Sequence, residues 1–302
     1  MVKNLVLENI SVGFKLPQGV FYAVDDVSLS LPGGNFTAII GESGCGKSVL
    51  GQAILNILPS GVIKKGRVLY NGEQVEKILS AFGIIPQNPS ESLNPVRKIG
   101  KQMQDILAVH NIADSDNSYK KQCLHLFGLQ EAERVLAAYP HELSGGMLQR
   151  VLCAMAVSSK PEWILADEPT KGLDEQVGAV VRKNLLTIKQ DLHLSMLIIT
   201  HDIALAQEVC DDVLVMYAGQ VLEHNADIWH KPLHPYTKGF LQALPKNGLQ
   251  VIPGKAPVPG ESFTGCKFAA RCPYCKTRCK EEKPVMQQVG NAEVRCFLYA
   301  EG

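Results

Sequence analysis

The sequence has no apolar stretch long enough to cross a membrane. No run in the 302-residue chain approaches the roughly 18 consecutive apolar residues that a bilayer-spanning helix needs. The N-terminal MVKNLVLENI alternates like an edge strand and lacks the apolar centre of a secretion signal. We therefore expect the chain to stay in the cytoplasm and to reach a membrane only through partners.

Net charge is also absent, and aromatic residues are few. Lysine plus arginine and aspartate plus glutamate number 30 each, so the chain lacks the basic excess typical of proteins that bind nucleic acid. Only 6% of the residues are aromatic, but 46% are hydrophobic. At this length the chain can bury one large α/β domain and a small appendage.

Cysteine is sparse until the end of the chain. Four of the nine cysteines are scattered before the last 40 residues: Cys45, Cys123, Cys153 and Cys210. We interpret the last three as helix-face residues that take no part in chemistry. The informative cysteines are therefore the ones in the tail.

A glycine-rich octapeptide, GESGCGKS, runs from Gly41 to Ser48 between an apolar run and an amphipathic stretch that extends to Leu58. This order predicts a strand, a tight loop and a helix. The loop's N–H groups would surround phosphate oxygens, Lys47 would neutralise the β and γ phosphates, and Ser48 would bind Mg²⁺. The predicted ATP-binding residues here are Gly41, Ser43, Gly44, Cys45, Gly46, Lys47, Ser48 and Val49.

A second apolar run, WILADE, ends in the two carboxylates Asp167 and Glu168. It has the pattern of a buried parallel strand that delivers both acids at its C-terminal edge. Because side chains alternate along a strand, the two acids cannot have the same task. We expect Asp167 to bind Mg²⁺ and Glu168 to polarise the water that attacks the γ-phosphate.

The segment LSGGMLQR, from Leu143 to Arg150, distinguishes this chain from other phosphate-loop proteins. With it, the sequence resembles the nucleotide-binding subunits of ABC transporters over roughly residues 3–245. Other motifs of that family follow in order: Gln87 in IIPQNP, PTKGLD after the catalytic acid, and His201 after MLIIT. Phe14 lies where the family places an aromatic ring against adenine, and Tyr22 is a weaker candidate.

The resemblance implies an α/β fold with a P-loop NTPase (RecA-like) core, an antiparallel β subdomain and a helical subdomain at about residues 89–155. It implies an ATPase in which two subunits pair head to tail and clamp each ATP between the phosphate loop of one and the LSGG of the other. The residues expected to meet the partner's ATP are Ser144, Gly145, Gly146 and Gln149.

By the same resemblance, Gln87 binds Mg²⁺ and senses the γ-phosphate and the membrane partner, His201 contacts the γ-phosphate, and Asp174 acts across the dimer interface. The family's usual pair of small residues before the Leu-Asp of this interface segment is Lys171-Gly172 here. Because of this departure, the resemblance does not fix how the two ATPase subunits are coupled across their interface.

Two segments away from the ATP site, residues 86–102 and 234–245, look like those of oligopeptide, dipeptide and nickel importers. The resemblance implies two permease subunits, an extracytoplasmic binding protein and a second, related ATPase as partners, at the cytoplasmic face of the membrane. The helical subdomain would touch the permease, with Lys120 and Lys121 on its solvated face. Peptides are the expected cargo, and nickel or a metal chelate is the alternative.

The tail, residues 246–302, is expected to be a small cysteine-rich module after the nucleotide-binding domain of residues 1–245. It has too few apolar residues for a core of its own, and disulfides do not persist in the cytoplasm, so a metal would stabilise it. Spacing alone does not separate zinc from an iron–sulfur cluster. The tail resembles that of peptide-importer ATPases with a [4Fe–4S] cluster, which implies Cys266, Cys272, Cys279 and Cys296 as ligands. Cys275 is an extra thiol that would replace a neighbour or bind zinc with it.

Two further functions compete with an importer ATPase. One is a soluble ABC-type ATPase acting on nucleic acid or ribosomes, against which the neutral charge and the single cassette count. The other is an ATPase regulated by a metal- or redox-sensing cysteine module.

The remaining patterns predict strands and turns. Residues before about 35 alternate like antiparallel strands, and hairpins are predicted around Asn71-Gly72 and Ala218-Gly219. Parallel strands are predicted at Trp163–Ala166 and Met196–Ile199, with an amphipathic helix between them.

Overall fold

The computed structural model describes residues 3–17, 19–74, 78–245, 248–258, 261 and 263–300. Contacts divide the chain into two compact units. As far as these ranges are described, unit 1 is formed by Met1–Lys3, Pro32–Phe36 and Glu76–Val209, and unit 2 by Asn4–Leu31, Thr37–Val75 and Cys210–Gly302. Among the described residues, no helix has the length and apolar character of a membrane span.

The first sheet of unit 2 is antiparallel, as the alternating N-terminal sequence predicts. Its strands, in spatial order, are β2 (Gly19–Leu31), β1 (Leu5–Leu16), β4 (Ile63–Tyr70) and β5 (Glu73–Gln74). The hairpin predicted between the last two is confirmed. Asn71 and Gly72 have φ angles of 52° and 84°, the left-handed values that a tight two-residue turn needs.

The second group of strands in unit 2 carries the phosphate loop. In spatial order these strands are β11 (Gln287–Val289), β12 (Ala292–Val294), β10 (Gln220–His224), β9 (Asp212–Tyr217) and β3 (Phe36–Gly41). β3 is parallel to β9, and the other neighbours are antiparallel. The hairpin predicted around Ala218-Gly219 is the β9–β10 turn.

The helices of unit 2 are α1 (Lys47–Leu55), α9 (Pro235–Gln242) and α10 (Thr277–Glu281). α1 is shorter than the amphipathic stretch predicts. Asn56 adopts a φ of 57°, and the N–H of Ile57 donates to Gln52 O at 3.0 Å, a left-handed cap that ends the helix. The apolar pattern therefore runs past the helix into the connection to β4.

The tail shares its core with the phosphate-loop strands instead of building one of its own. β12 pairs with β10, where Val294 lies opposite Glu223. Phe268 is 1% exposed and contacts the rings of Tyr217 and Tyr236 edge-on. A small aromatic core supplied by both parts explains how so few apolar residues can order this segment, and the domain boundary at residue 245 stays a prediction.

Unit 1 is built on three parallel strands that are buried except at Ile84 and Asp167: β8 (Ser195–Ile199), β7 (Trp163–Asp167) and β6 (Phe82–Ile85), in this spatial order. Both predicted strands are confirmed. Helices α7 (Glu175–Thr187) and α8 (Ile203–Val209) follow β7 and β8 along the chain. Since the strands are parallel, their C-terminal ends lie at one edge of the sheet.

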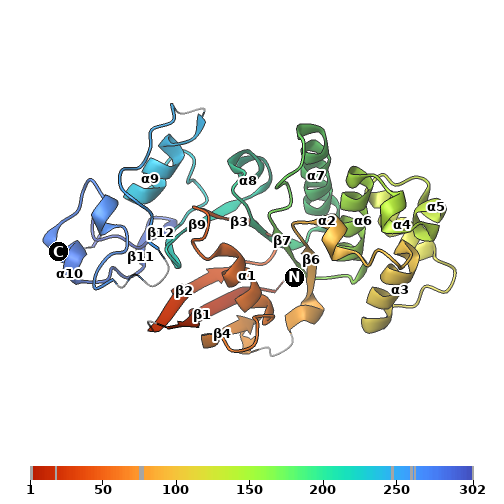
Figure 1. Cartoon of the computed structure of the whole chain (residues 1–302), viewed down its shortest axis with the longest axis horizontal. Helices are drawn as coiled ribbons and strands as arrows, with labels where there is room; N and C mark the ends of the chain where they lie inside the picture. The colour runs from red at the N-terminus through yellow and green to blue at the C-terminus, as the bar shows by residue number, and fades with distance from the viewer. Residues whose placement is uncertain are drawn as a thin grey trace. The chain divides into compact units, whose positions relative to one another are not determined.

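A group of helices occupies the part of unit 1 between β6 and β7. These helices are α2 (Pro89–Ser92), α3 (Ile99–Val109), α4 (Ser118–Leu126), α5 (Ala132–Ala137) and α6 (Gly145–Ser158). Figure 1 shows α3, α4, α5 and α6 gathered together, and α6 contacts α2, α3 and α4. The range Pro89–Ser158 corresponds to the helical subdomain expected at about residues 89–155.

Candidate functional site

The phosphate loop joins β3 to α1, and its backbone packs too closely for side chains at two of its glycines. A Cβ on Gly41 would lie 2.2 Å from Met216 O, and one on Gly46 would lie 2.1 Å from Ala23 O. Gly46 also has a φ of 105°, which side-chain-bearing residues avoid. The two fixed glycines of the sequence pattern are therefore required by sterics, and they bring the loop to the start of α1.

Lys47 is buried at the first position of α1, and its ammonium group lies against the loop. Nζ donates to Gly41 O at 2.9 Å and to Glu42 O at 3.0 Å. Burial raises the pKa of the neighbouring Cys45 thiol, whose sulfur is 3.9 Å from Nζ. A cation fixed next to loop N–H groups and a helix N-terminus is the arrangement that binds phosphate.

In unit 1, β7 ends with the two acids, and the backbone turns sharply between them. Glu168 has a φ of 49°, unusual for a residue with a side chain, and its N–H donates to Ile199 O at 2.7 Å. The Glu168 residue is only 9% exposed. Its Oε2 lies 2.6 Å from His201 Nδ1 and also accepts from the His201 N–H at 3.3 Å.

The strand register brings the other predicted catalytic residues of unit 1 to the same edge. Ile85 lies opposite Ala166, and Asp167 lies opposite Ile199. Gln87 and His201 each follow their strand by two residues, and Gln87 is exposed. The predicted strand ends at Asp167, Glu168 and His201 are confirmed, and Gln87, for which we predicted no strand, follows β6. The four residues gather an amide, two carboxylates and an imidazole.

A threonine and an aspartate that we did not predict fix the segments around Glu168 and His201. Thr170 Oγ1 donates to Asp202 Oδ2 at 3.2 Å. The N–H of Asp202 donates to Thr200 Oγ1 at 2.9 Å, and Asp202 Oδ1 accepts from Leu205 N at 3.0 Å in the first turn of α8. The polar residues in PTKGLD and ITHD were the available signal for this link.

The LSGG segment leads into α6, as the sequence predicts. Ser144 is the N-cap residue, and its hydroxyl accepts from Met147 N at 3.3 Å. Nothing described lies within 4 Å of a Cβ built on Gly145 or Gly146, so the Cβ side of both glycines borders open space. Gln149 is instead fully buried, and its amide donates to Pro169 O at 3.3 Å. The contact of Gln149 with a partner's ATP stays a prediction.

Asp174 caps α7, where its carboxylate accepts from Val177 N at 2.9 Å. It is exposed, as are Lys171 and Gly172 before it. An exposed capping carboxylate is compatible with a further contact to another subunit, and that role stays a prediction.

The two aromatic candidates for stacking on adenine lie on the first hairpin of unit 2. Phe14 is opposite Phe21, and Tyr22 is opposite Gly13. Tyr22 lines a cavity of about 340 Å³ together with Gly44 of the phosphate loop. Phe14 is half-buried outside the described lining of that cavity, so its adenine contact stays a prediction.

Comparison with known proteins decides the family. A family model described as "ABC transporter" matches residues 24–171, and one described as "Oligopeptide/dipeptide transporter, C-terminal region" matches residues 222–279. The oligopeptide transport ATP-binding protein OppD of Haemophilus influenzae is 34% identical over 98% of this chain and 98% of its own length. The chain belongs to the ATP-binding subunits of ABC transporters, in the oligopeptide and dipeptide branch.

Other members of this ABC family are equally similar. AppD of Bacillus subtilis, an oligopeptide transport ATP-binding protein, is 35% identical over 98% of this chain and 97% of its own. DppD of Escherichia coli, a dipeptide transport ATP-binding protein, is 35% identical over 95% of this chain and 94% of its own. The resemblance drawn from the motifs is confirmed, nickel gains no support, and the nucleic-acid alternative is not favoured.

Solved structures confirm the ABC cassette fold. A dimeric ATP-binding cassette bound to ADP and phosphate is 24% identical, with a TM-score of 0.62 over 73% of this chain and 97% of that one. CbiO1 of Clostridium perfringens, part of the transporter complex cbiONQ, is 25% identical, with a TM-score of 0.62 over 74% of this chain and 89% of that one. The α/β class, with antiparallel and mixed sheets, is as predicted.

The tail cysteines of this ABC subunit lie near one another without forming a metal-binding arrangement. Burial and the nearby thiols Cys279, Cys296 and Cys272 raise the pKa of Cys266 to about 11. The Cys266 N–H donates to Cys279 O at 2.8 Å. No group of three or more Cys, His, Asp or Glu among the described residues is placed to hold a metal ion. The thiols are therefore gathered in one segment, but the geometry of the described residues does not bear out the expected metal.

The buried cysteines outside the tail behave as expected. Cys123 and Cys153 lie on α4 and α6, and both are buried. Burial raises the pKa of Cys153 to about 12 and also raises that of Cys123. Thiols with such pKa values stay protonated and unreactive. Cys210 lies after the end of α8 and is half-buried, so the prediction that it is a helix-face residue is wrong.

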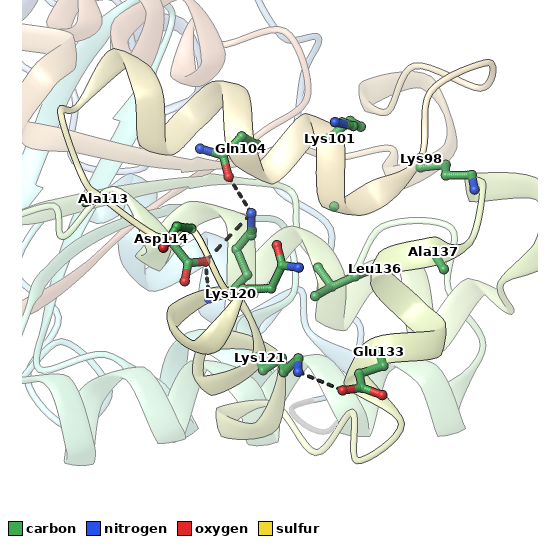
Figure 2. A pocket seen from close by; sticks show the side chains of 13 residues that line it. Lys98, Lys101, Gln104, Ala113, Asp114, Lys120, Lys121, Glu133, Leu136 and Ala137 are labelled. Atoms are coloured by element: carbon green, nitrogen blue, oxygen red, sulfur yellow. Dashed lines mark hydrogen bonds and ion pairs between the residues drawn. The ribbon is translucent and has the colours of Figure 1, made fainter.

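A cavity of about 860 Å³ lies among α3, α4 and α5, and Lys120 is one of the residues that line it. The prediction that Lys120 lies on a solvated face is wrong. Figure 2 shows Lys120 directed at Gln104 and Asp114. The Lys120 side chain is 4% exposed and that of Asp114 is fully buried. Lys120 is therefore part of a buried ion pair and not of the solvated face, whereas Lys121 pairs with the exposed Glu133.

Proposed function

We propose that this subunit binds and hydrolyses ATP to power the import of di- or oligopeptides. The observation that carries this proposal is the strand-end group in unit 1, where Glu168 is fixed by His201 beside Asp167 and Gln87. Lys47 and the loop N–H groups of unit 2 supply the phosphate-binding part. Both parts stand in a chain whose relatives are named for oligopeptide and dipeptide transport.

Glu168 would act as the base that orients the attacking water, since its carboxylate is almost buried and aimed by His201. The His201 side chain is 57% exposed. A neutral imidazole has one N–H group, so a ring that donates from Nδ1 to Glu168 has only an acceptor at Nε2. A charged imidazole has two N–H groups and can donate to Glu168 and to a phosphate at the same time. Ser48, Asp167 and Gln87 would hold Mg²⁺, which neutralises phosphate charge.

The central test is the Glu168→Gln variant. It should lose turnover by about 10²-fold or more, because the amide cannot accept the water's proton, while ATP binding persists. The measurements are phosphate release and titration with a fluorescent ATP analogue. Glu175→Gln, at an exposed acid that begins α7, is the matched control and should keep wild-type turnover. Near wild-type turnover in Glu168→Gln would remove Glu168 from the mechanism.

We further propose that a groove next to Gln87 receives a cytoplasmic helix of a permease subunit. The groove is a cavity of about 530 Å³, lined in part by Ile84, Pro86, Leu93, Arg97 and Met155. Its lining includes residues of the helical subdomain and Pro86, which immediately precedes Gln87, the residue expected to sense both ATP and the membrane partner. Ile84 is apolar and 39% exposed there.

The permease proposal is tested by Ile84→Asp, which places a charge in the groove without emptying the core. This variant should bind ATP normally yet fail to copurify with permease subunits from detergent-solubilised membranes. Val109→Asp is the control, because Val109 is 78% exposed on α3 and outside the described lining of the groove. Normal copurification of Ile84→Asp would disprove the docking site, and recovery of ribosomes with either protein would favour the soluble ATPase.

The same purification tests the dimer. We propose that the second ATPase is a related but different subunit, as expected from the resembling importers. A second ABC ATPase in the purified complex would support this, and two copies of this chain alone would contradict it.

We also propose that Cys266, Cys272, Cys279 and Cys296 hold a [4Fe–4S] cluster, with zinc as the alternative and Cys275 as an extra thiol. Support comes from the four thiols in one segment, where burial and the nearby Cys279, Cys296 and Cys272 raise the pKa of Cys266. Anaerobically purified protein should contain iron and acid-labile sulfide, lost in Cys272→Ser and kept in Cys275→Ser. Stoichiometric zinc without sulfide would replace the cluster, and neither metal would end the proposal.

A further inference from the structure

Glu42 occupies a variable position of the phosphate loop, yet it is anchored at three separate points. Both of its carboxylate oxygens lie near Arg271 Nη1, at 3.1 and 3.2 Å. Its N–H donates to Tyr236 Oη at 3.2 Å, and its carbonyl accepts from Lys47 Nζ at 3.0 Å. Glu42 therefore links the phosphate-binding lysine to residues more than 190 positions later in the chain.

Arg271 is itself fixed in place. Its side chain is 8% exposed, Nε donates to Pro253 O at 3.1 Å, and Nη1 donates to Tyr217 Oη at 3.2 Å. The guanidinium lies 5.7 Å from the ring centre of Tyr217 and 5.9 Å from that of Phe268. Such a buried cation needs its carboxylate partner, and the surrounding rings leave it little freedom to move.

The charge of Glu42 needs an explanation in this place. A loop that wraps its N–H groups around phosphates is unfavourable for a carboxylate, because like charges repel most strongly where solvent is partly excluded. Arg271 lies on the carboxylate and cancels its charge. It also keeps the Glu42 backbone in the position from which its carbonyl contacts Lys47.

We propose that Arg271 is a positioning residue for ATP binding, which neutralises Glu42 and holds the phosphate loop ready for the nucleotide. The proposal rests on the proposed ATPase function. It gives the tail a direct part in the nucleotide site, since Arg271 immediately precedes Cys272 and its N–H donates to Phe268 O at 3.0 Å within the tail. The order of the tail then sets the affinity of the loop for ATP.

A set of three variants tests this proposal by ATP affinity. Arg271→Ala leaves Glu42 charged and unpaired, so the Kd for a fluorescent ATP analogue should rise about tenfold or more at low salt. Glu42→Gln removes the charge, while its amide oxygen can still accept a hydrogen bond from Arg271, and this variant should bind ATP near the wild-type level. The double variant Arg271→Ala with Glu42→Gln should regain most of the lost affinity, which a purely structural arginine would not allow.

Arg278→Ala is the matched control, because Arg278 lies in the same tail but is 52% exposed and pairs with Glu282. It should leave the Kd unchanged. If Arg271→Ala does not fold, the same comparison is made with Arg271→Gln alone and with Arg271→Gln combined with Glu42→Gln. A double variant that binds ATP as weakly as the single arginine variant would overturn the proposal. The test measures only ATP binding. It can therefore be carried out, and can support or overturn the proposal, even if the protein transports no peptide.

Discussion

His201 Nδ1 lies 2.6 Å from Glu168 Oε2, and the His201 N–H donates to the same oxygen at 3.3 Å. Two contacts from one residue fix the direction of the carboxylate at the end of β7. The imidazole itself remains largely exposed, so one side of it contacts Glu168 and another faces solvent. If the two residues act in catalysis as we propose, these contacts make them one unit.

The first prediction follows from this unit. His201→Ala should reduce ATP turnover by about 10²-fold or more with ATP binding retained, because Glu168 loses its orientation and the phosphate loses a contact. The double variant with Glu168→Gln should be little slower than Glu168→Gln alone, since residues that act together are not additive. Single-turnover phosphate release measures both. Fully additive losses would show that the two residues act independently.

The phosphate loop gives a second prediction with its own control. Gly46→Ala would place a Cβ 2.1 Å from Ala23 O and should abolish binding of a fluorescent ATP analogue. Gly44→Ala meets nothing described within 4 Å, although its φ of 77° makes the substitution strained by about 1–2 kcal/mol. Gly44→Ala should therefore still bind ATP. Equal losses in the two variants would contradict the steric account.

The buried ion pair of the helical subdomain gives a third. Lys120→Met leaves the Asp114 carboxylate buried without its cation, and we expect a loss of about 3–5 kcal/mol in the free energy of unfolding. Lys121→Ala, which breaks the exposed pair with Glu133, should cause no measurable change. Urea unfolding followed by circular dichroism compares the two. Equal free energies of unfolding for the two variants would contradict the buried ion pair and indicate that Lys120 is exposed to solvent.

His234 gives a prediction for pH. Burial lowers its pKa from 6.5 to about 3, and its ring nitrogen accepts from Tyr236 N at 3.0 Å. Between pH 3 and pH 6.5 the unfolded chain binds a proton at His234 that the folded protein does not. The free energy of unfolding therefore has its full value above pH 6.5 and decreases as the pH falls. The expected slope is about 1.4 kcal/mol per pH unit.

The His234→Asn variant separates this effect from other histidines. It should be less stable than the wild type at pH 8, because packing is lost, but its stability should fall less steeply between pH 6.5 and 5. Urea unfolding at several pH values gives both slopes. Parallel slopes would show that His234 is not the titrating group.

Short motifs predicted the phosphate loop and the strand-end acids because both depend on local spacing. GESGCGKS required its loop, and the strand-end acids followed from an apolar run of fixed period. Other features depend on contacts between residues far apart in the chain. Lys120 contacts Gln104, 16 residues earlier, and Glu42 pairs with Arg271, 229 residues later, and no local pattern points to either contact.

The end of α1 and the tail show the same limit. The apolar pattern beyond Leu55 belongs to residues that are partly or fully exposed, and only the left-handed Asn56 ends the helix. The tail has too few apolar residues to form a core alone, which led us to expect a metal-stapled module. Phe268 instead shares a core with Tyr217 and Tyr236, and such sharing has no local sequence pattern.

The most direct test of the account is peptide uptake. Cells of the source organism that lack this chain would be complemented with the wild type or with Glu168→Gln, and uptake of a labelled tripeptide and of radioactive nickel would be measured in parallel. We predict that the wild type restores tripeptide uptake, that Glu168→Gln does not, and that nickel uptake is the same in all strains. Unchanged peptide uptake in the strain without this chain, or restoration of nickel uptake alone, would contradict a peptide importer.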